Sequence, residues 1–462
     1  MTPPRPQTLD EAYEIIVAQA RVIEQLQEKI RELEEQLRIL KGGRPKDLTI
    51  RSFFKPNVRS KGAKPGPPLG HAAAVWTVPE TIHEEREWFL ENCPDCGGQV
   101  SEAVETVERI EMDVPPVSPV VRKHTMGRHW CGRCRKLVQA KAEGLLPHTP
   151  YGRNIHLLAA YLKYGLGMTI DKARDLFSEI YGLPMGSGVV SEMLMRVGDW
   201  MGPVHGHLKE SLSLQSVIHA DETGWRVSGE NHWLWSFSGM RGAYYHIDRS
   251  RGQRVVADVL GEKFDGVLVT DFFGAYGKIE ASKQKCWVHV LRDIKEMSED
   301  FPQDPEVISF AKAIKRWMRT AFDLKDRWGV RRPAHFHREA HRIEQALLGW
   351  FMKPMTHPDI RRLQKRLMKY RKELFVFLRH KEVPAHNNNA ERQIRPAVLM
   401  RKTSYQNRSQ RGALTQAILM SAIQTCHKRK LNFMEWGKNY LAAIHSSADP
   451  PPDPFALPSP AL

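Results

Sequence analysis

Long apolar runs are absent from this sequence of 462 residues. No window of about 18 consecutive apolar residues occurs, and a membrane-spanning helix needs at least that length, so we expect no membrane partner. The N-terminal stretch MTPPRPQTLDEAYE lacks the charged and then apolar order of a secretion signal. We therefore expect a cytoplasmic protein, and the length predicts about three structural units.

Cysteine is also scarce, and its spacing is uneven. Four of the six cysteines form two CxxC pairs, namely Cys93, Cys96, Cys131 and Cys134. In a reducing compartment such pairs favour a metal site over disulfides. Tetrahedral Zn²⁺ needs four soft ligands, and each CxxC turn presents two thiolates on one side, with Gly97 and Gly132 easing the tight backbone. We predict structural zinc at these cysteines; free thiols and a redox dithiol are the alternatives.

The segment between the cysteine pairs has the pattern of a strand. Ile110, Met112 and Val114 alternate there with acidic residues. Two CxxC turns that flank a strand pair resemble a zinc ribbon, although the spacing between the pairs is longer than is common in ribbons.

Acidic residues are fewer than basic ones, and the basic excess is clustered. The chain has 53 Asp and Glu against 69 Lys and Arg, a formal charge of +16. Residues 41–65 carry eight basic residues against Asp47, and residues 391–430 carry nine against Glu391. Clustered positive charge attracts polyanions, of which nucleic acid is the commonest in cells. A solvated basic surface is the alternative interpretation.

Residues 9–40 repeat apolar side chains with a heptad period. The a and d positions are Leu9, Ala12, Ile16, Gln19, Ile23, Leu26, Ile30, Leu33, Leu37 and Leu40. More than four heptads that end at the breaker KGGRP predict a leucine-zipper coiled coil and a homo-oligomer. A single amphipathic helix packed on its own chain is the alternative. The basic, Pro- and Gly-rich stretch that follows reads as a linker.

The middle of the chain changes from helical periodicity to a mixed pattern. Residues 154–200 predict a helix, a Gly/Pro turn and a second helix, which fits a helix-turn-helix module or an ordinary helical hairpin. The expected elements after it are strands at SVIHAD, HWLWSFS and AYYHI, a helix at QRVVADVL, a strand at GVLVTD, a short helix around residues 275–279 and a strand at KCWVHV. Three strands in a meander, a helix and then a buried strand give the order of an RNase H-like α/β domain.

Two of these apolar strands end in an aspartate. In an RNase H-like sheet the first and fourth strands are neighbours, so their ends would bring Asp221 and Asp271 together. Two like charges at a buried edge cost free energy unless a cation lies between them. Glu222 would point to the opposite face of its strand, and we expect it to be hydrogen-bonded rather than to bind metal.

A third acid is expected from another element. Phosphodiester displacement is stabilised by two Mg²⁺ ions about 3.5 to 4 Å apart, and Mg²⁺ prefers carboxylate ligands. Glu391 in HNNNAERQIRPAVLMRK is the best candidate, because it is the single acid of residues 391–430. One half of a structural ion-pair network is the alternative role. His289 is expected to pack beside Trp287 rather than to approach a phosphate.

These motifs in this order resemble bacterial DDE transposases of the insertion sequence 66 family. The residues that carry the resemblance are the leucine zipper, KPGPPLGH, CPDCGG with CGRC, HADETGWRV, VTDFFGAY, CWVHVLRD and NNNAERQIRPAVLMRKTSYQNRSQRGA. The resemblance implies that Asp221, Asp271 and Glu391 are the catalytic triad, binding two Mg²⁺ ions or Mn²⁺ in their place. It also implies two small accessory proteins encoded by the same element.

The function that follows is transposition in the bacterial cytoplasm, at the nucleoid. We expect the chain to bind the terminal inverted repeats of its element, to cut a DNA strand at each end and to join the 3′-hydroxyl to target DNA. Arg392 and Arg395 would lie near the scissile phosphate, with Arg401 and Lys402 supplying salt-dependent affinity. A non-catalytic zinc-ribbon and coiled-coil DNA-binding regulator is one alternative, and a nuclease without strand transfer is another.

The predicted organisation places the catalytic domain in the second half of the chain. Its parts are a coiled coil (8–41), a basic linker (42–90), a zinc-ribbon DNA-binding domain (91–140), a helical region that is a DNA-binding candidate (150–212), an RNase H-like catalytic domain (213–430) with a helical insertion (290–386), and a C-terminal helix with a Pro-rich tail (431–462).

Overall fold

The computed structural model describes residues 81–114, 117–140, 142, 145–330 and 332–445, together with residues 25, 26, 28–30 and 32. Those six N-terminal residues are helical. The rest of the predicted coiled coil, the linker up to residue 80 and the Pro-rich tail from residue 446 lie outside the described residues. The chain divides into two units, residues 1–113 and 114–462, which we describe separately.

The described part of the first unit has little regular structure. An isolated antiparallel bridge joins Asn92 to Gln99, and it encloses the first CxxC pair. The strand predicted at Ile110 to Val114 is wrong, because residues 105–114 form no strand. Alternation alone does not make a strand without a neighbour to accept its backbone hydrogen bonds.

The second unit begins with a hairpin and a group of helices. Strands β1 (Arg128–Cys131) and β2 (Lys136–Gln139) are antiparallel. The helices that follow are α2 (Arg153–Ala160), the π-helix η1 (Tyr161–Gly165), α3 (Ile170–Tyr181), α4 (Ser187–Trp200) and α5 (Gly202–Leu212). The predicted helix–turn–helix is α3 and α4, joined after Gly182, whose φ of 59° needs a glycine or a similar small residue. Its second helix packs on α2 and on α12 (Gln410–Lys428).

A five-stranded mixed sheet forms the centre of this unit. Its strands are β3 (Val217–Val227), β4 (Glu230–Ser238), β5 (Ala243–Asp248), β6 (Lys263–Thr270) and β7 (Glu280–Lys285), in the spatial order β5-β4-β3-β6-β7. The first three are antiparallel, whereas β3, β6 and β7 run parallel. Helix α6 (Gln253–Leu260) lies between β5 and β6 in the chain, and the short 3-10 helix η2 (Gly274–Tyr276) follows β6. The predicted adjacency of the first and fourth strands is therefore confirmed.

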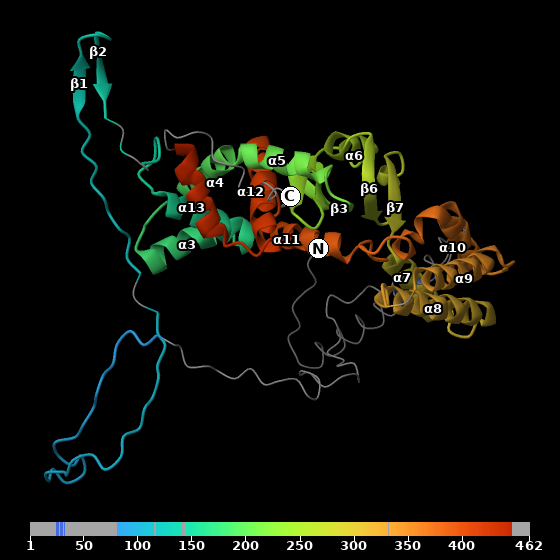
Figure 1. The fold of residues 1–462 in the computed structure, drawn as a ribbon, viewed down its shortest axis with the longest axis horizontal. Coiled ribbons are helices and arrows are strands. Elements are labelled where there is room, and N and C mark those ends of the chain that lie inside the picture. Colours follow the sequence, from blue (N-terminus) through green and yellow to red (C-terminus); the bar gives the residue numbers. More distant parts are fainter. Residues whose placement is uncertain are drawn as a thin grey trace, which may run out of the picture. The chain divides into compact units, whose positions relative to one another are not determined.

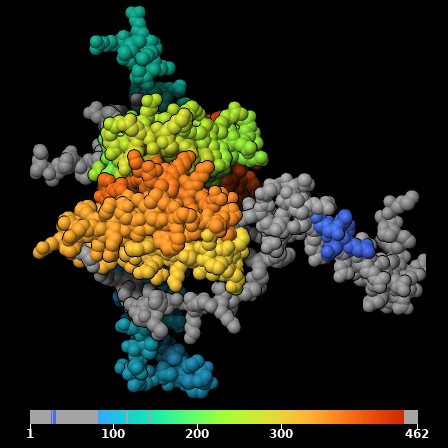
Figure 2. All heavy atoms as spheres, turned by 90° about the vertical axis from the view of Figure 1, so that its right-hand side faces the viewer, coloured from blue at the N-terminus to red at the C-terminus, as the bar shows by residue number. Residues whose placement is uncertain are grey.

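Helices gather at the β7 edge of the sheet (Figure 1). They are α7 (Trp287–Asp300), α8 (Pro305–Asp326), α9 (Pro333–Met352) and α10 (Pro358–Lys369), followed by the 3-10 turns η3 (Arg371–Glu373) and η4 (Val376–Leu378). Figure 2 shows this segment, in yellow and orange, against the yellow-green residues of the sheet. The chain then returns through α11 (Asn388–Ser404), which packs on β3 and β4, and ends with α12 and α13 (Phe433–His445).

Alternate residues of β6 belong to two different hydrophobic clusters. Leu268 lies in the larger cluster, with α6, α12 and the helices α2–α5, whereas Val267 and Val269 lie in a second cluster with α7–α10. The same alternation continues on β3, where Ile218 belongs to the first cluster and Val217 packs on the second. Before Asp221 and Asp271, the even-numbered residues of β3 and β6 therefore face the first cluster, and the odd-numbered residues face the second.

Two predicted boundaries are wrong. β3 does not end at Asp221, because its pairing with β4 continues to Val227. The predicted strand KCWVHV is mostly helix: α7 begins at Trp287, and its buried positions have helical rather than strand spacing. A short apolar run cannot distinguish the two periods. Among the helices that the structure describes, none is long and apolar enough to cross a membrane.

Candidate active site

Asp221 and Asp271 occupy matching positions on two neighbouring parallel strands. The ladder between β3 and β6 pairs Val217 with Val267 and His219 with Val269. Asp221 lies two residues after His219, and Asp271 lies two residues after Val269. Because side chains alternate along a strand, both aspartates continue the same face of the sheet. Neighbouring strands lie about 4.8 Å apart, which places the two carboxylates at one edge of the parallel ladder.

Glu391 approaches this edge from the first turn of α11. The packing of α11 on β3 brings its charge close enough to raise the pKa of Asp221, as does the charge of Asp271. Glu391 forms no ion pair with a described residue, so the predicted alternative role in a structural ion-pair network has no support in this part of the chain.

The pKa of Asp221 is raised to about 7. Burial is the largest cause, followed by repulsion from Glu222, while a backbone N–H from Glu222, 2.9 Å from Asp221 Oδ1, opposes the shift. The charges of Glu222, Asp271 and Glu391, all carboxylates, each raise the pKa of Asp221. A buried carboxylate among other carboxylates is an environment that a divalent cation stabilises, so Asp221, Asp271 and Glu391 fit Mg²⁺.

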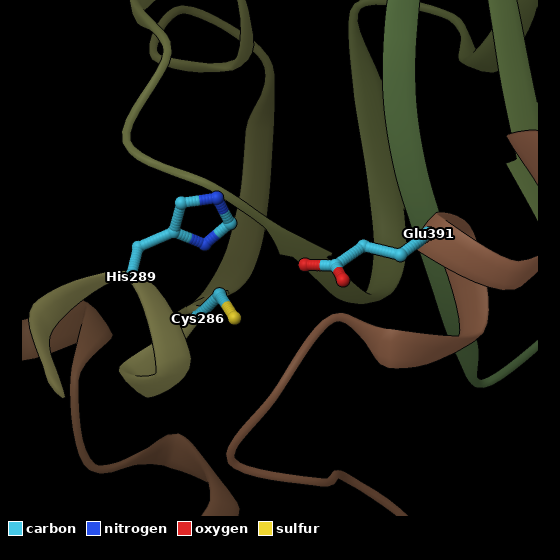
Figure 3. Close-up of side chains that lie close together, drawn as sticks. All are labelled: Cys286, His289 and Glu391. Atoms are coloured by element: carbon cyan, nitrogen blue, oxygen red, sulfur yellow. The ribbon is translucent and has the colours of Figure 1, made fainter. Parts of the chain in front are cut away.

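The three acids are spread out rather than converging on one point. Among the described residues, the one group of three potential ligand atoms that lie within 4.8 Å of one another comprises Cys286, His289 and Glu391 (Figure 3). Two Mg²⁺ ions about 3.5 to 4 Å apart, each about 2 Å from its ligands, can be held by oxygens up to ~8 Å apart. A separation greater than 4.8 Å between acid oxygens is therefore within the reach of a pair of ions.

Glu222 has a structural environment on the opposite face of β3. Its Oε2 accepts a hydrogen bond of 2.5 Å from the Tyr276 hydroxyl, and its Oε1 lies 2.9 Å from Arg251 Nη2. The Arg251 guanidinium lies over the rings of Trp233 and Phe273, at 4.2 and 4.0 Å from their centroids. The expectation that Glu222 is hydrogen-bonded is confirmed.

Two buried polar residues near the acids were missed by the sequence analysis. Asn387, at the start of α11, donates from Nδ2 to the Ala220 carbonyl at 2.9 Å and lies 3.0 Å from His219. Lys285 donates from Nζ to the Asp271 carbonyl at 2.9 Å and to Thr270 Oγ1 at 3.0 Å. Burial lowers the pKa of Lys285 to about 8. The run of three asparagines shortly before Glu391 was a sequence signal for Asn387. The polar sequence of β7 gave no such signal for Lys285.

The basic residues of α11 divide into two groups. Arg392, Arg395 and Lys402 are exposed and make no side-chain hydrogen bond or ion pair with described residues. Arg401 differs, because its Nη1 donates to the Gly224 carbonyl and, at 3.1 Å, to Thr223 Oγ1. Arg401 therefore fastens α11 to β3, which leaves its guanidinium less free for a phosphate than predicted.

The second CxxC pair forms the turn of the β1–β2 hairpin. Cys131 ends β1, and the backbone N–H of Cys134 donates to Cys131 Sγ at 3.4 Å. Backbone N–H groups, that of Cys134 first, lower the pKa of Cys131 and so favour the thiolate that zinc binds. The left-handed residue of this turn is Arg135, with φ 47°, and not Gly132 as predicted.

The first CxxC pair has the same local design in its own unit. Gly97 follows Cys96 with φ 74°, as predicted, and its N–H donates to the Cys93 carbonyl at 2.8 Å. The backbone N–H of Cys96 is the largest cause that lowers the pKa of Cys93. All four thiols are free of disulfides.

Comparison with known proteins assigns both parts of the chain to one family. A family model described as the zinc-finger binding domain of transposase IS66 matches residues 91–135. A second model, described as the transposase IS66 family, matches residues 148–415, which is more than half of the chain. The chain belongs to the IS66 family of transposases. The resemblance inferred from the motifs is confirmed, and membership implies action on DNA and a structural zinc.

This IS66 transposase has distant relatives in Sinorhizobium fredii. The protein y4qI is 22% identical over 415 residues, covering 82% of this chain and 75% of the relative. The protein y4hP is 21% identical and covers 79% of this chain and 73% of the relative. A shorter match to y4jO, 24% identical, covers 37% of this chain and 51% of that relative. The names of these relatives state no activity.

Proposed function

We propose that this IS66 transposase binds the terminal inverted repeats of its element, cleaves DNA strands at the element ends and joins the 3′-hydroxyl to target DNA. The observation that carries the proposal is the placement of Asp221 and Asp271 at matching positions of two parallel strands, with the charge of Glu391 acting on the same carboxylate. We infer an RNase H-like catalytic domain because the meander β3-β4-β5, the helix α6 and the central strand β6 occur in that order.

Asp221, Asp271 and Glu391 would hold two Mg²⁺ ions, or Mn²⁺ in their place. Such a pair activates the attacking oxygen and stabilises the charge on the leaving oxygen during phosphoryl transfer. The protein contributes placement: β3 and β6 fix two acids on one face, and α11 supplies the third. Lys285, which donates to the Asp271 carbonyl, orients the end of β6.

DNA contact is assigned to the exposed basic residues of α11. Arg395 lies one helical turn after Glu391, so the two side chains share a face of α11, and Arg392 lies one turn before Arg395. A phosphate near Glu391 would therefore meet Arg395 first, with Arg392 on the adjoining face of the helix beside Arg395. Lys402 would add non-specific affinity further along the same helix. Arg401 retains at most a secondary role, because its guanidinium already bonds to β3.

The remaining parts of the chain are assigned supporting roles. Zn²⁺ held by Cys93, Cys96, Cys131 and Cys134 would stabilise a DNA-binding segment, which agrees with the family match over residues 91–135. Leu26 and Ile30, two heptad positions, are more than half exposed in the single chain, as expected for a seam that needs a partner helix. We therefore propose self-association through residues 8–41, action on nucleoid DNA in the bacterial cytoplasm, and contact with element-encoded accessory proteins. The predicted domain boundaries stand as part of this proposal.

A cleavage assay tests the proposal directly. Purified protein is incubated with labelled DNA that carries the element ends, in Mg²⁺ and in EDTA. Mg²⁺-dependent nicking at the ends followed by joined products supports a transposase. Binding without nicking would favour the non-catalytic regulator, and nicking without joined products would favour a nuclease.

A further inference from the structure

Cys286, His289 and Glu391 meet where three elements join. Cys286 follows β7 and caps the N-terminus of α7, His289 lies in the first turn of that helix, and Glu391 lies in the first turn of α11. Their ligand atoms all lie within 4.8 Å of one another. In Figure 3 the Glu391 carboxylate points toward the His289 ring, with the Cys286 sulfur beside them.

The donor set differs in chemistry from the carboxylate edge. A thiolate, an imidazole and a carboxylate are the ligands of borderline divalent ions such as Zn²⁺ and Co²⁺, whereas Mg²⁺ takes oxygen ligands. Three protein ligands with an open fourth position are typical of a tetrahedral site that keeps a water or an exchangeable ligand. Zinc bonds of about 2.0 to 2.3 Å put ligand atoms ~3.3 to 3.8 Å apart, so small side-chain rotations would close this set on an ion.

Two polar atoms of the cluster have environments that suit a metal. His289 Nδ1 is buried, and no described residue gives it a hydrogen bond. A buried polar atom without a partner destabilises the fold unless a ligand or ion satisfies the ring. Cys286 Sγ accepts the backbone N–H of Asn387 at 3.2 Å and lies at a helix N-terminus, an arrangement that stabilises a thiolate.

We propose that Cys286, His289 and Glu391 form a binding site for a borderline divalent cation, with Zn²⁺ as the natural ligand, separate from the four-cysteine segment. Because Glu391 belongs to both donor sets, an ion held by Cys286 and His289 draws its carboxylate away from Mg²⁺. Zinc at this site therefore inhibits strand cleavage. The binding claim stands on the cluster itself, and the inhibition claim rests on the proposed function.

Cobalt spectroscopy tests the binding claim without any enzymatic readout. Zinc is removed from the full-length protein with a chelator, Co²⁺ is titrated in, and the thiolate-to-cobalt charge-transfer band is followed in the parent, Cys286→Ser, His289→Gln and Cys426→Ser. Cys426 is the matched control, since it is a buried cysteine with no histidine or acid grouped with it in the described chain. The four-cysteine segment is the same in all four proteins, so it contributes equally.

The site predicts that one equivalent of cobalt binding is lost in two of the variants. Cys286→Ser loses the part of the band that this site contributes, and His289→Gln weakens cobalt binding at this site by more than the ~10- to 100-fold that loss of a supporting group around a metal ligand costs. Cys426→Ser binds like the parent. The half-exposed His289 keeps the test valid if Cys286→Ser does not fold. Equal binding in the parent and in His289→Gln would overturn the site.

Cleavage in fixed Mg²⁺ with added Zn²⁺ tests the inhibition claim. The ratio of rates with and without Zn²⁺ should fall steeply in the parent and stay nearly constant in His289→Gln. An equal loss in both proteins would refute inhibition through this cluster. Absence of cleavage in every condition would refute the proposed function instead, while the cobalt result would still decide whether the site exists.

Discussion

Asn387 Oδ1 and His219 Nδ1 form a buried hydrogen bond of 3.0 Å that joins the start of α11 to β3. Burial is the main cause that lowers the pKa of His219 to about 4, so the ring is neutral at pH 7. Because Asn387 Nδ2 donates to the Ala220 carbonyl, its Oδ1 accepts, and His219 carries its proton on Nδ1. The backbone N–H of Asn387 donates to Cys286 Sγ. One asparagine thus connects the element that carries Glu391 to the strand that carries Asp221.

Asn387→Ala should destabilise the fold and impair cleavage together. The change leaves the His219 N–H and the Ala220 carbonyl buried without partners, at ~1 to 3 kcal/mol each. We expect the free energy of unfolding to fall by about 2 to 4 kcal/mol in urea titrations. Asn388→Ala is the control, because Asn388 makes no side-chain hydrogen bond with a described residue and should change stability by less than about 0.5 kcal/mol. Equal effects of the two changes would contradict the bridging role.

Asp221→Asn should stabilise the metal-free protein in a pH-dependent way. The folded pKa of Asp221, about 7, lies above its unfolded value near 3.8. The contribution of Asp221 to the free energy of unfolding is therefore fully present below about pH 4 and is lost as pH rises to about 7. The variant should match the parent at pH 4 and exceed it by on the order of 4 kcal/mol at pH 8. Urea unfolding at both pH values, in EDTA, measures the difference.

Mg²⁺ should reverse that ranking at pH 8. The parent gains stability because the ion binds the folded state, whereas Asp221→Asn has lost a ligand and gains less. A parent whose unfolding midpoint does not respond to Mg²⁺ would count against metal binding at this edge.

Asp271→Asn should abolish cleavage and leave DNA binding intact. The change keeps the shape of the side chain and removes a charge from the Mg²⁺ ligand set, so cleavage should fall by several orders of magnitude. Electrophoretic mobility shifts with end DNA should stay within about twofold of the parent, because the exposed arginines supply that affinity. Asp265→Asn is the control, since Asp265 lies on the same strand but is exposed. A near-parental rate in Asp271→Asn would remove Asp271 from the site.

Cys131→Ser should release zinc without unfolding the catalytic part. We predict that metal analysis finds one zinc per chain at the four cysteines of the parent and one zinc fewer per chain in the variant. Structural zinc contributes folding free energy directly, so residues 93–134 should become sensitive to protease while the sheet stays protected. Cys426→Ser should keep its zinc. A parent that contains no zinc after purification in chelator-free buffer would contradict the assignment.

Arg395→Ala should change the salt dependence of DNA binding, whereas Arg401→Ala should change the stability of the fold. The exposed Arg395 should leave stability unchanged and reduce the slope of log K against log salt by about 1, the loss of one phosphate contact. Arg401 holds α11 on β3, so its removal should cost ~1 to 3 kcal/mol of stability and change the salt slope little. A reversed pattern would mean that Arg401 contacts DNA and Arg395 does not.

The sequence sufficed to predict that the first and fourth strands of the sheet are neighbours, while the roles of the three acids stay a prediction. Alternation and apolar runs located β3, β4, β5, α6 and β6, because each has a clear period and a turn on both sides. It could not locate the end of β3, because the residues after Asp221 owe their strand conformation to pairing with β4.

The polar contacts among distant segments were beyond sequence reasoning. Cys286 and Asn387 are separated by about a hundred residues, and only folding shows that a sulfur and an amide meet. The sequence analysis assigned Arg401 to DNA binding because the sequence gives the charge of a side chain but not its partners. Its bond to the Gly224 carbonyl depends on how α11 lies against β3.

The helical excursion from α7 to α10 leaves and rejoins the sheet at neighbouring points. The Trp287 N–H donates to the Ala385 carbonyl at 2.9 Å, next to the contact of Cys286 with Asn387. The two ends of the excursion are therefore held together at the start of α11, and the contacts of Asn387 with β3 fix the helix that carries Glu391. The helices α7–α10 can therefore change during evolution, for example to bind new partners, while the helix that carries Glu391 keeps its place.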